Sequence, residues 1–339
     1  MYLKIGFIGC GRWAQQTYLP FLKNNSSLEL VALSGSSRTE NGVALASKLG
    51  FTQFYDDWKK MLAKEKLDLV FITTPHTLHY EQIKGCLENN IHVHVDKPPV
   101  LHFDQATELL KLANEKKLVV SVHSQRRFYE EYKSVKSLIE KGALGGIQFV
   151  QGDFGQQLFD DFRGSWRSNP ELSGGGIMID SGYHLLDSIL FMLGKVEPKS
   201  VVMLSNRGEF QSDTFSTLSC QLETDCLITL NVIRGLPQNV ATERVQIVGT
   251  KGWVLISRDR RNGKTNLTFE VYDVDGNQTN FLSEEVLVVD RVAPLHNLIS
   301  ALSKERNVDS SLEQSLTTVQ ILEAGYKSLK TNQLVQLRA

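Results

Sequence analysis

Residues Leu3–Ala14 read LKIGFIGCGRWA, and this stretch decides the fold of the first part of the chain. An apolar run ending at Ile8 is typical of a buried strand. Gly9, Gly11 and Ala14 follow it with the G-x-G-x-x-G/A spacing of a turn that opens a helix. Such glycines permit the tight turn and the close approach of a pyrophosphate, which the positive helix N-terminus faces. The stretch predicts a dinucleotide site, with these contacts: Gly9, Cys10, Gly11, Arg12 and Trp13.

Outward from this loop, strand-like and helix-like segments alternate as far as residue 122. Apolar runs at 28–33, 69–73, 92–95 and 118–122 are separated by amphipathic stretches of helical length. This rhythm predicts βαβ units with right-handed crossovers and a parallel sheet. From about 199 to 290, strand-like runs separated by turn signals dominate, and two helices follow. We therefore expect an α/β Rossmann domain at 1–122 and an α+β domain at 123–339 with a large, open, mostly antiparallel sheet.

The composition is that of an ordinary globular protein. The 339 residues carry a net charge of −1, and 41% are hydrophobic. This length favours two domains, and the absence of excess cations argues against nucleic-acid binding. No apolar run reaches the roughly 18 residues of a membrane span. Four scattered cysteines imply neither a disulfide framework nor a zinc site. With no evident leader before the first strand, we expect a soluble cytoplasmic protein.

The end of the second strand bears on cofactor choice. NAD-specific sites place an acidic residue there, to accept from the ribose 2′-hydroxyl. Here the chain has Ser34–Thr39, SGSSRT, while Glu29 lies at the start of the strand. Ser37 and Arg38 suit a 2′-phosphate, because arginine donates to phosphate in a forked geometry. The segment favours NADP over NAD, although Arg38 could also be a solvated loop residue.

Two further polar segments follow buried strands. Thr73–His79 ends one strand, and Asp96–Pro99 ends the next. Ligands bind at these carboxyl ends in open α/β sheets. An ammonium such as that of Lys97 would stabilise an alkoxide-like oxygen there. The same lysine could equally be a solvated residue in a loop, and this segment alone does not choose between the two.

Gly174–Asp187, GGGIMIDSGYHLLD, places an acid and a histidine beside three glycines. In a helix from about residue 177, Asp180, His184 and Asp187 would share one face. An aspartate can orient an imidazole that accepts a hydroxyl proton, and histidine titrates in the right range. The glycines would let another backbone or a ligand approach. A polar surface face would give the same pattern, but the neighbouring glycines favour a site.

Together these segments resemble the Gfo/Idh/MocA family of glucose–fructose oxidoreductase and inositol dehydrogenase relatives. The resemblance rests on Gly6–Ala14, Thr73–His79, His92–Pro98 and Gly174–Asp187, and Tyr326–Ser328 looks like part of the family's last helix. It implies a Rossmann domain, then an α/β domain whose open sheet forms homodimer or homotetramer interfaces. One departure is Asp96, where the family usually has Glu; the shorter side chain puts its reach to a cofactor ribose in doubt.

The resemblance also implies residue roles. Lys97 would lie near nicotinamide and substrate, and Asp180 and His184 match the family's acid–histidine pair, with His184 as proton acceptor. Further cofactor contacts would be Thr74, Pro75, His79, Asp96, Trp166 and Arg167. Beyond Lys97 and His184, the candidate substrate contacts are Arg127, Gln156 and Tyr183.

These features favour an NAD(P)-dependent oxidoreductase that acts on a hydroxyl-bearing carbon of a sugar, polyol or sugar derivative. A glycosidase that uses bound cofactor for a transient oxidation, and a non-catalytic dinucleotide-binding regulator, are the alternatives. A metal hydrolase built on His76, His79, His92 and His94 is disfavoured, since no third ligand stands at a recognisable spacing. We therefore expect no metal. The substrate itself is not identified by the sequence.

Overall fold

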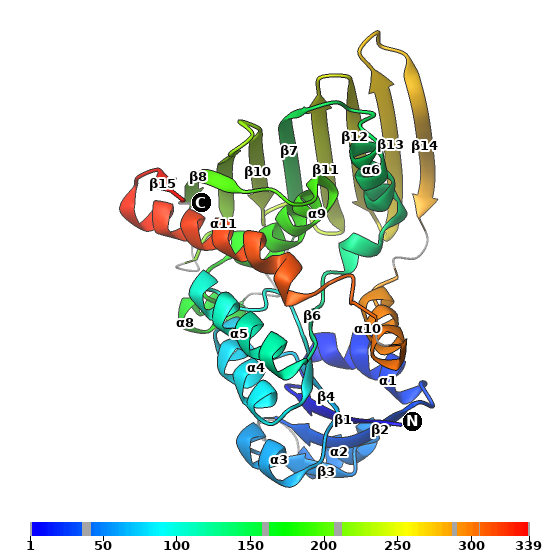
Figure 1. Ribbon diagram of the computed structural model, residues 1–339, viewed down its shortest axis with the longest axis vertical. Coiled ribbons are helices and arrows are strands. Elements are labelled where there is room, and N and C mark those ends of the chain that lie inside the picture. Colours follow the sequence, from blue (N-terminus) through cyan, green and yellow to red (C-terminus); the bar gives the residue numbers. More distant parts are fainter. Residues whose placement is uncertain are drawn as a thin grey trace. The chain divides into compact units, whose positions relative to one another are not determined.

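The computed structural model describes residues 2–35, 42–157, 163–206, 212–286, 290–304 and 306–337, and it divides into two compact units (Figure 1). The first unit comprises Met1–Gln125 with Asp290–Ser315, and the second comprises Arg126–Val289 with Leu316–Ala339. Each unit has its own sheet. Among the described residues, no helix is both long and apolar enough to cross a membrane.

The first unit is built on a six-stranded parallel sheet of order β3-β2-β1-β4-β5-β6. Its strands are β1 (Leu3–Ile8), β2 (Leu28–Ser34), β3 (Gln53–Tyr55), β4 (Leu69–Ile72), β5 (His92–Val95) and β6 (Val120–Val122). The order reverses between β1 and β4, which is the switch point at which doubly wound sheets bind their ligands. The predicted Rossmann fold is confirmed, and the glycine loop directly follows β1.

Helices connect these strands, with one departure from the expected pattern. They are α1 (Leu19–Lys23), α2 (Gly42–Leu49), α3 (Trp58–Lys64), α4 (His79–Glu88) and α5 (Phe103–Lys116), with short turns η2 (His76–Leu78) and η3 (Gln125–Phe128). Helix α10 (Ala293–Lys304) belongs to the same unit but comes from a later part of the chain. The first connection is not one continuous α-helix, because a π-helical turn, η1 (Ala14–Tyr18), runs into α1.

The expected domain boundary at residue 122 needs correction at the C-terminal end. The domain expected at 123–339 would include α10, but residues 290–315 belong to the first unit. Leu295 and Leu298 are fully buried and share a hydrophobic cluster with Ile5, Phe7 and Tyr18. A single boundary along the chain cannot describe a segment that returns to the first unit. Burial of the apolar face of α10 decides where this segment packs.

The second unit contains a nine-stranded sheet of order β14-β13-β12-β11-β7-β10-β9-β8-β15. Only the β7–β10 pair is parallel among the pairings of the described strands, so the expected mostly antiparallel sheet is confirmed. Its strands are β7 (Ile147–Gln156), β8 (Pro198–Asn206), β9 (Phe215–Leu222), β10 (Leu227–Ile233), β11 (Val240–Gly249), β12 (Gly252–Arg261), β13 (Lys264–Asp273), β14 (Gln278–Val286) and β15 (Val335–Gln336).

Helices cover one face of this sheet (Figure 1). They include α6 (Glu130–Glu140), α9 (Tyr183–Leu193) and α11 (Leu312–Thr331), and the short elements η4 (Trp166–Ser168), α8 (Pro170–Ser173) and η5 (Met178–Gly182) precede α9. Strand residues alternate between buried and more exposed, as in β9, because only one face packs against the helices.

Candidate functional site

The glycine loop of the first unit holds two glycines with different requirements. Gly9 has a φ of +87°, and a Cβ there would lie 2.9 Å from Thr74 Cγ2, so the fold itself requires glycine. Its N–H donates to the Ser34 carbonyl (2.9 Å), and the Thr73 hydroxyl donates to its carbonyl (3.0 Å). A Cβ on Gly11, by contrast, would meet nothing within 4 Å. The open side of the loop at Gly11 therefore leaves room for a ligand.

The chain leaves this loop through the π turn η1. Ala14 is buried, and its small side chain allows the close packing of helix on strand. The Gln15 amide donates to Gly11 O (3.1 Å), and its side chain donates to Cys10 O (3.1 Å), which fixes the loop backbone. Such π turns occur often at functional sites. Cys10, Arg12 and Trp13 thus lie between the strand end and the turn, while their predicted cofactor contacts stay a prediction.

The segment that bears on cofactor choice begins at the end of β2. Ser37 and Arg38 lie outside the described residues. Strand β2 ends at Ser34, and Gly35 N donates to Tyr55 O (3.2 Å). Glu29 pairs with Lys4 at the beginning of β1, which is the end of the strand away from the glycine loop. The preference for NADP therefore stays a prediction.

His79 ties together the two loops that follow β4 and β5. The imidazole is fully buried, with Nδ1 2.8 Å from Pro98 O and Nε2 2.9 Å from Thr74 O. Burial lowers its pKa to about 4, so the ring is neutral at pH 7. The Thr74 hydroxyl donates to Gln82 Oε1 (2.6 Å). A neutral imidazole carries one N–H, so it donates to only one of these two carbonyls. From its position between them, His79 shapes the segment that also contains Pro75.

Asp96 and Lys97 follow β5 at the same edge of the sheet. Lys97 is 9% exposed, and its backbone N–H donates to Asp96 Oδ1 (3.1 Å). The Tyr18 hydroxyl lies 3.5 Å from the same oxygen. Burial, assisted by the Asp96 charge, raises the pKa of Tyr18 well above its ordinary value. Tyr18 is thus a neighbour of the motif that the sequence analysis did not identify.

Two buried histidines extend this polar cluster. His94 Nδ1 lies 3.0 Å from the Ser121 hydroxyl, and His94 Nε2 lies 3.2 Å from His123 Nδ1. The ring of Tyr18 packs 4.8 Å from that of His123. Burial lowers the pKa of His94 well below its ordinary value and that of His123 to about 4. Among the described residues, no group of three or more His, Cys, Asp or Glu is arranged to hold a metal ion.

In the second unit, Asp180 lies in the π turn η5, and His184 lies in the first turn of α9. A continuous α-helix is expected from residue 177, but its first turn is a π turn, which is wider than an α-helical turn. Asp180 is 8% exposed, and His184 is half-buried. Arg167 Nε is 3.7 Å from Asp180 Oδ2, and its guanidinium stacks on the Trp166 ring at 4.5 Å. The structure thus brings Trp166 and Arg167 to the predicted acid.

Protein groups explain the three glycines before this turn. Gly174 has a φ of +74° and ends α8. A Cβ on Gly175 would lie 2.4 Å from the Tyr326 ring, and one on Gly176 would lie 2.1 Å from Asp213 O. Of the two predicted uses of the glycines, the structure shows the close approach of other parts of the chain.

Asp213 fastens the start of η5. Its carboxylate accepts from the amides of Gly176 (2.6 Å) and Met178 (2.8 Å), and from the hydroxyl of Tyr326 (2.9 Å). Acceptance from backbone N–H groups is the usual way to satisfy a helix N-terminus. Asp213 is separated by many residues from all three partners, so no local sequence signal could have identified it.

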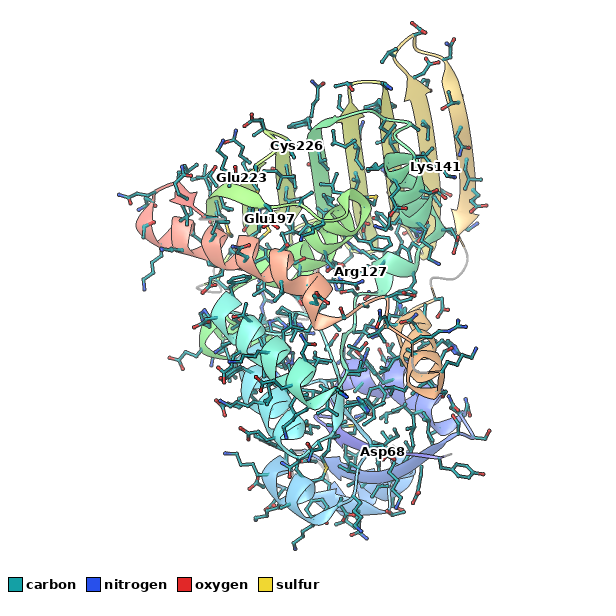
Figure 2. The ribbon with its side chains drawn as sticks, in the orientation of Figure 1. Asp68, Arg127, Lys141, Glu197, Glu223 and Cys226 are labelled. Atoms are coloured by element: carbon teal, nitrogen blue, oxygen red, sulfur yellow. The ribbon has the colours of Figure 1, made fainter. Side chains whose placement is uncertain are left out.

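The predicted substrate contacts fall into two groups. Arg127, which lies just before α6 (Figure 2), forms a buried two-pronged ion pair with Asp187, at 2.8 and 2.6 Å. Tyr183 is fully buried. Both placements favour structural roles. Gln156, at the end of β7, donates to the Ser181 hydroxyl (3.0 Å), beside the π turn.

The fold and the glycine loop define a dinucleotide-binding Rossmann protein, and comparison with known proteins extends this. Residues 3–124 match the model of an oxidoreductase family with an NAD-binding Rossmann fold, and residues 132–255 match the GFO/IDH/MocA C-terminal domain. Together these matches cover well over half of the chain. The chain belongs to this family.

Similar proteins include sugar and polyol dehydrogenases. D-glucoside 3-dehydrogenase of Escherichia coli K12 is 32% identical over 59% of this chain and 56% of its own length. The scyllo-inositol 2-dehydrogenase (NADP(+)) IolW of Bacillus subtilis 168 is 26% identical over 59% of this chain and 53% of its own. The matches thus span little more than half the length of these relatives.

Solved structures share the whole fold. Levoglucosan dehydrogenase, in a complex with NADH and levoglucosan, has a TM-score of 0.81 and 17% identity, with full coverage of both chains. The WlbA dehydrogenase of Bordetella pertussis, with NADH and UDP-GlcNAcA, has a TM-score of 0.81 and 20% identity, again with full coverage of both. At 17–20% sequence identity, these structures show a shared fold and not a shared activity.

Proposed function

We propose that this protein is an NAD(P)-dependent oxidoreductase that transfers a hydride between nicotinamide and a hydroxyl-bearing carbon of a sugar, polyol or sugar derivative. The observation that carries the proposal is the open side of the glycine loop at Gly11, at the switch point of a Rossmann sheet. The family membership supports the reaction type, and the named activities of the relatives support the substrate class.

The residues of the first unit fit a dinucleotide. The backbone of Gly9–Trp13 would face the pyrophosphate, and the loops at Thr74–Pro75 and Asp96–Lys97 would line the ribose and nicotinamide. When bound, the cofactor accepts or returns the hydride. Lys97 would polarise the substrate oxygen, since a buried ammonium stabilises developing negative charge.

In the second unit, His184 would accept the hydroxyl proton and Asp180 would orient its imidazole. Arg167 lies beside Asp180 and would contribute to the same region with Trp166. Among Arg127, Gln156 and Tyr183, Gln156 is the best candidate for a substrate contact. It lies beside the π turn that contains Asp180.

For the cofactor, we propose a preference for NADP based on Ser37 and Arg38 in the sequence. One relative is named as an NADP(+) enzyme, whereas both of the solved structures described above contain NADH. We also propose a cytoplasmic location and a homodimer or homotetramer formed through the sheet of the second unit. Leu204, Phe215, Leu227 and Ile233 support the assembly, because they are exposed apolar residues of β8–β10.

The function is tested by incubation of the purified protein with NADP or NAD and a panel of sugars and inositols, with reduced cofactor followed by absorbance. We expect turnover with at least one substrate, and a loss of about 100-fold or more in Lys97→Ala and His184→Ala. The exposed residues Lys64 and His296 serve as matched controls, as Lys64→Ala and His296→Ala.

Other outcomes would support one of the alternative functions or refute the assigned residues. Release of a sugar without net change in cofactor would indicate the glycosidase. Cofactor binding without any turnover would indicate the regulator. Undiminished activity in both Lys97→Ala and His184→Ala would refute the residue assignment.

A further inference from the structure

Arg291 comes from a segment far along the chain from the glycine loop, and its side chain nevertheless reaches that loop. It lies just before α10, in residues 290–315, which return to the first unit. Its guanidinium carbon is 5.5 Å from the ring centroid of Trp13, within the range of a cation–π contact. Trp13 follows Gly11 closely in the loop predicted to bind the dinucleotide. The fold therefore holds a cation next to this loop that no sequence motif indicates.

Contacts made by its neighbours fix the backbone of Arg291. The Asp290 carboxylate accepts from the Val292 amide (3.0 Å). The Val292 carbonyl accepts from the amides of Leu295 (2.9 Å) and His296 (3.1 Å) at the start of α10. The side chain of Val292 packs against the hydrophobic cluster that contains Leu295. The packing of α10 on the first unit therefore sets the place from which the Arg291 side chain extends.

The two partners of the cation–π contact differ in exposure. The Trp13 ring is partly buried, and it meets the ring of His123 edge to face at 6.3 Å. Arg291 is exposed, and no carboxylate among the described residues forms an ion pair with it. A cation–π contact engages the charge of a guanidinium and leaves its N–H groups for other acceptors. Trp13 thus holds a cation whose donors can serve a ligand.

The chemistry of a guanidinium decides which part of a dinucleotide it can meet here. The adenine ring is neutral, and the oxidised nicotinamide ring is itself a cation, so neither attracts a positive side chain. Arginine donates to phosphate oxygens in a forked geometry. The glycine loop offers a phosphate mainly backbone amides, and a nearby cation adds charge to that contact. The pyrophosphate is therefore the group that suits Arg291.

We propose that Arg291 is a cofactor-binding residue, which donates to the pyrophosphate of the bound dinucleotide while Trp13 holds its guanidinium in place. The inference rests on the proposed function, because it adds a contact to the same dinucleotide site. In this arrangement the local glycine motif supplies backbone amides, and the returning segment supplies a charged side chain. The returning segment thus contributes to binding as well as to the hydrophobic core.

Calorimetric titration of the full chain with NAD, NADP and ADP-ribose tests the contact. All three ligands contain the pyrophosphate, whereas only NADP carries a 2′-phosphate and ADP-ribose lacks nicotinamide. We expect Arg291→Ala to raise the Kd of each ligand by a similar factor, about tenfold or more, because a charge-assisted hydrogen bond is lost. Arg291→Lys should keep part of the affinity, since it retains the charge without the fork.

The pattern across the ligands locates the contact. A loss confined to NADP would place Arg291 at the 2′-phosphate, and a loss with NAD and NADP but not with ADP-ribose would place it at the nicotinamide. Either pattern would overturn the proposal.

A matched control separates this contact from a general effect of charge. Arg306 is also exposed and lies in the same returning segment. Arg306→Ala removes one positive charge as well, and it should leave each Kd within about twofold of the native value. The urea midpoint of Arg291→Ala should stay close to that of the native protein. A lower midpoint with unchanged Kd values would assign Arg291 to packing on Trp13 alone and would refute the contact.

Failure of the inference can be told apart from failure of the proposed function. Native protein that binds and turns over a dinucleotide, with equally tight binding by Arg291→Ala, would refute the inference alone. Native protein that binds none of the three ligands would refute both.

Discussion

Gly11 and Gly176 show how differently two glycines of one chain are used. A Cβ on Gly176 would lie 2.1 Å from the Asp213 carbonyl oxygen and 2.6 Å from its carboxylate. A Cβ on Gly11 would enter open space. The first glycine is needed for packing, and the second is free to serve a ligand.

Alanine at the two positions should therefore give opposite results. Gly176→Ala should lower the free energy of unfolding by about 1–3 kcal/mol, because the Asp213 backbone must move. Gly11→Ala should leave stability unchanged but weaken dinucleotide binding about tenfold or more, since the methyl group occupies the space that a pyrophosphate would use. Urea unfolding and calorimetric titration with NADP and NAD measure the two effects. Normal binding by Gly11→Ala would contradict the assignment of the loop.

At the scale of elements, the pair β5–β6 carries the buried polar cluster. His94 and Ser121 are opposite one another in register, and the following His123 N–H donates to Val95 O (2.9 Å). His123 thus lies on the same face as His94 and next to Asp96 and Lys97, whose charges act on it in opposite directions. Both histidines are held as neutral rings in the fold.

This cluster should make the stability of the protein sensitive to acid. The folded-state pKa of His123 is about 4, below the ordinary 6.5 of an exposed histidine. Between these values the unfolded chain binds more protons, so stability is fully present above pH 6.5 and falls as the pH drops toward 4. The loss attributable to His123 approaches about 3 kcal/mol.

Urea unfolding at a series of pH values between 7 and 4.5 measures this loss. His123→Phe, which keeps a ring against Tyr18, should flatten the dependence of stability on pH. His296→Gln, at an exposed position of the same unit, is the control and should keep the slope of the native protein. Equal slopes for His123→Phe and the native protein would exclude this explanation.

At the scale of the whole molecule, the sheet of the second unit has one face covered by helices and one open. The register of β8, β9 and β10 places Leu204, Phe215, Leu227 and Ile233 on the same face, opposite the buried residues of these strands. Phe215 pairs directly with Ile233. Leu204, Phe215 and Ile233 lie near one end of these strands, whereas Leu227 lies at the other end of β10. Exposed apolar residues on the open face of a sheet favour association with a second copy.

Charge on this face should therefore break the proposed assembly. Leu204→Asp combined with Phe215→Asp should convert the oligomer to a monomer, as measured by light scattering after size exclusion, because burial of a carboxylate in an apolar interface is costly. Val43→Asp and Val274→Asp, at exposed apolar positions away from these three strands, should leave the assembly intact. A native protein that is monomeric at micromolar concentration would refute the proposal.

How far the sequence could predict the molecule differs between its parts. The glycine loop, the alternating strands and the acid–histidine segment are local patterns. The loop and the strands lie where the sequence predicts, whereas of the acid–histidine pair only His184 lies in an α-helix. The π turns at Ala14–Tyr18 and Met178–Gly182 were not predicted, because the apolar spacing of so short a turn does not distinguish it from an α-helix. The roles proposed for Lys97, Asp180 and His184 remain predictions.

The sequence by itself determined the Rossmann fold and the family, because both depend on residue types at short, fixed spacings. The tertiary structure decided what distant residues do. It assigned residues 290–315 to the first unit, placed Asp213 and Tyr326 against the glycine triplet, and engaged Arg127 with Asp187. These partners are dozens of residues apart, and only the packing of helices on the sheet brings their charges and backbones within contact distance.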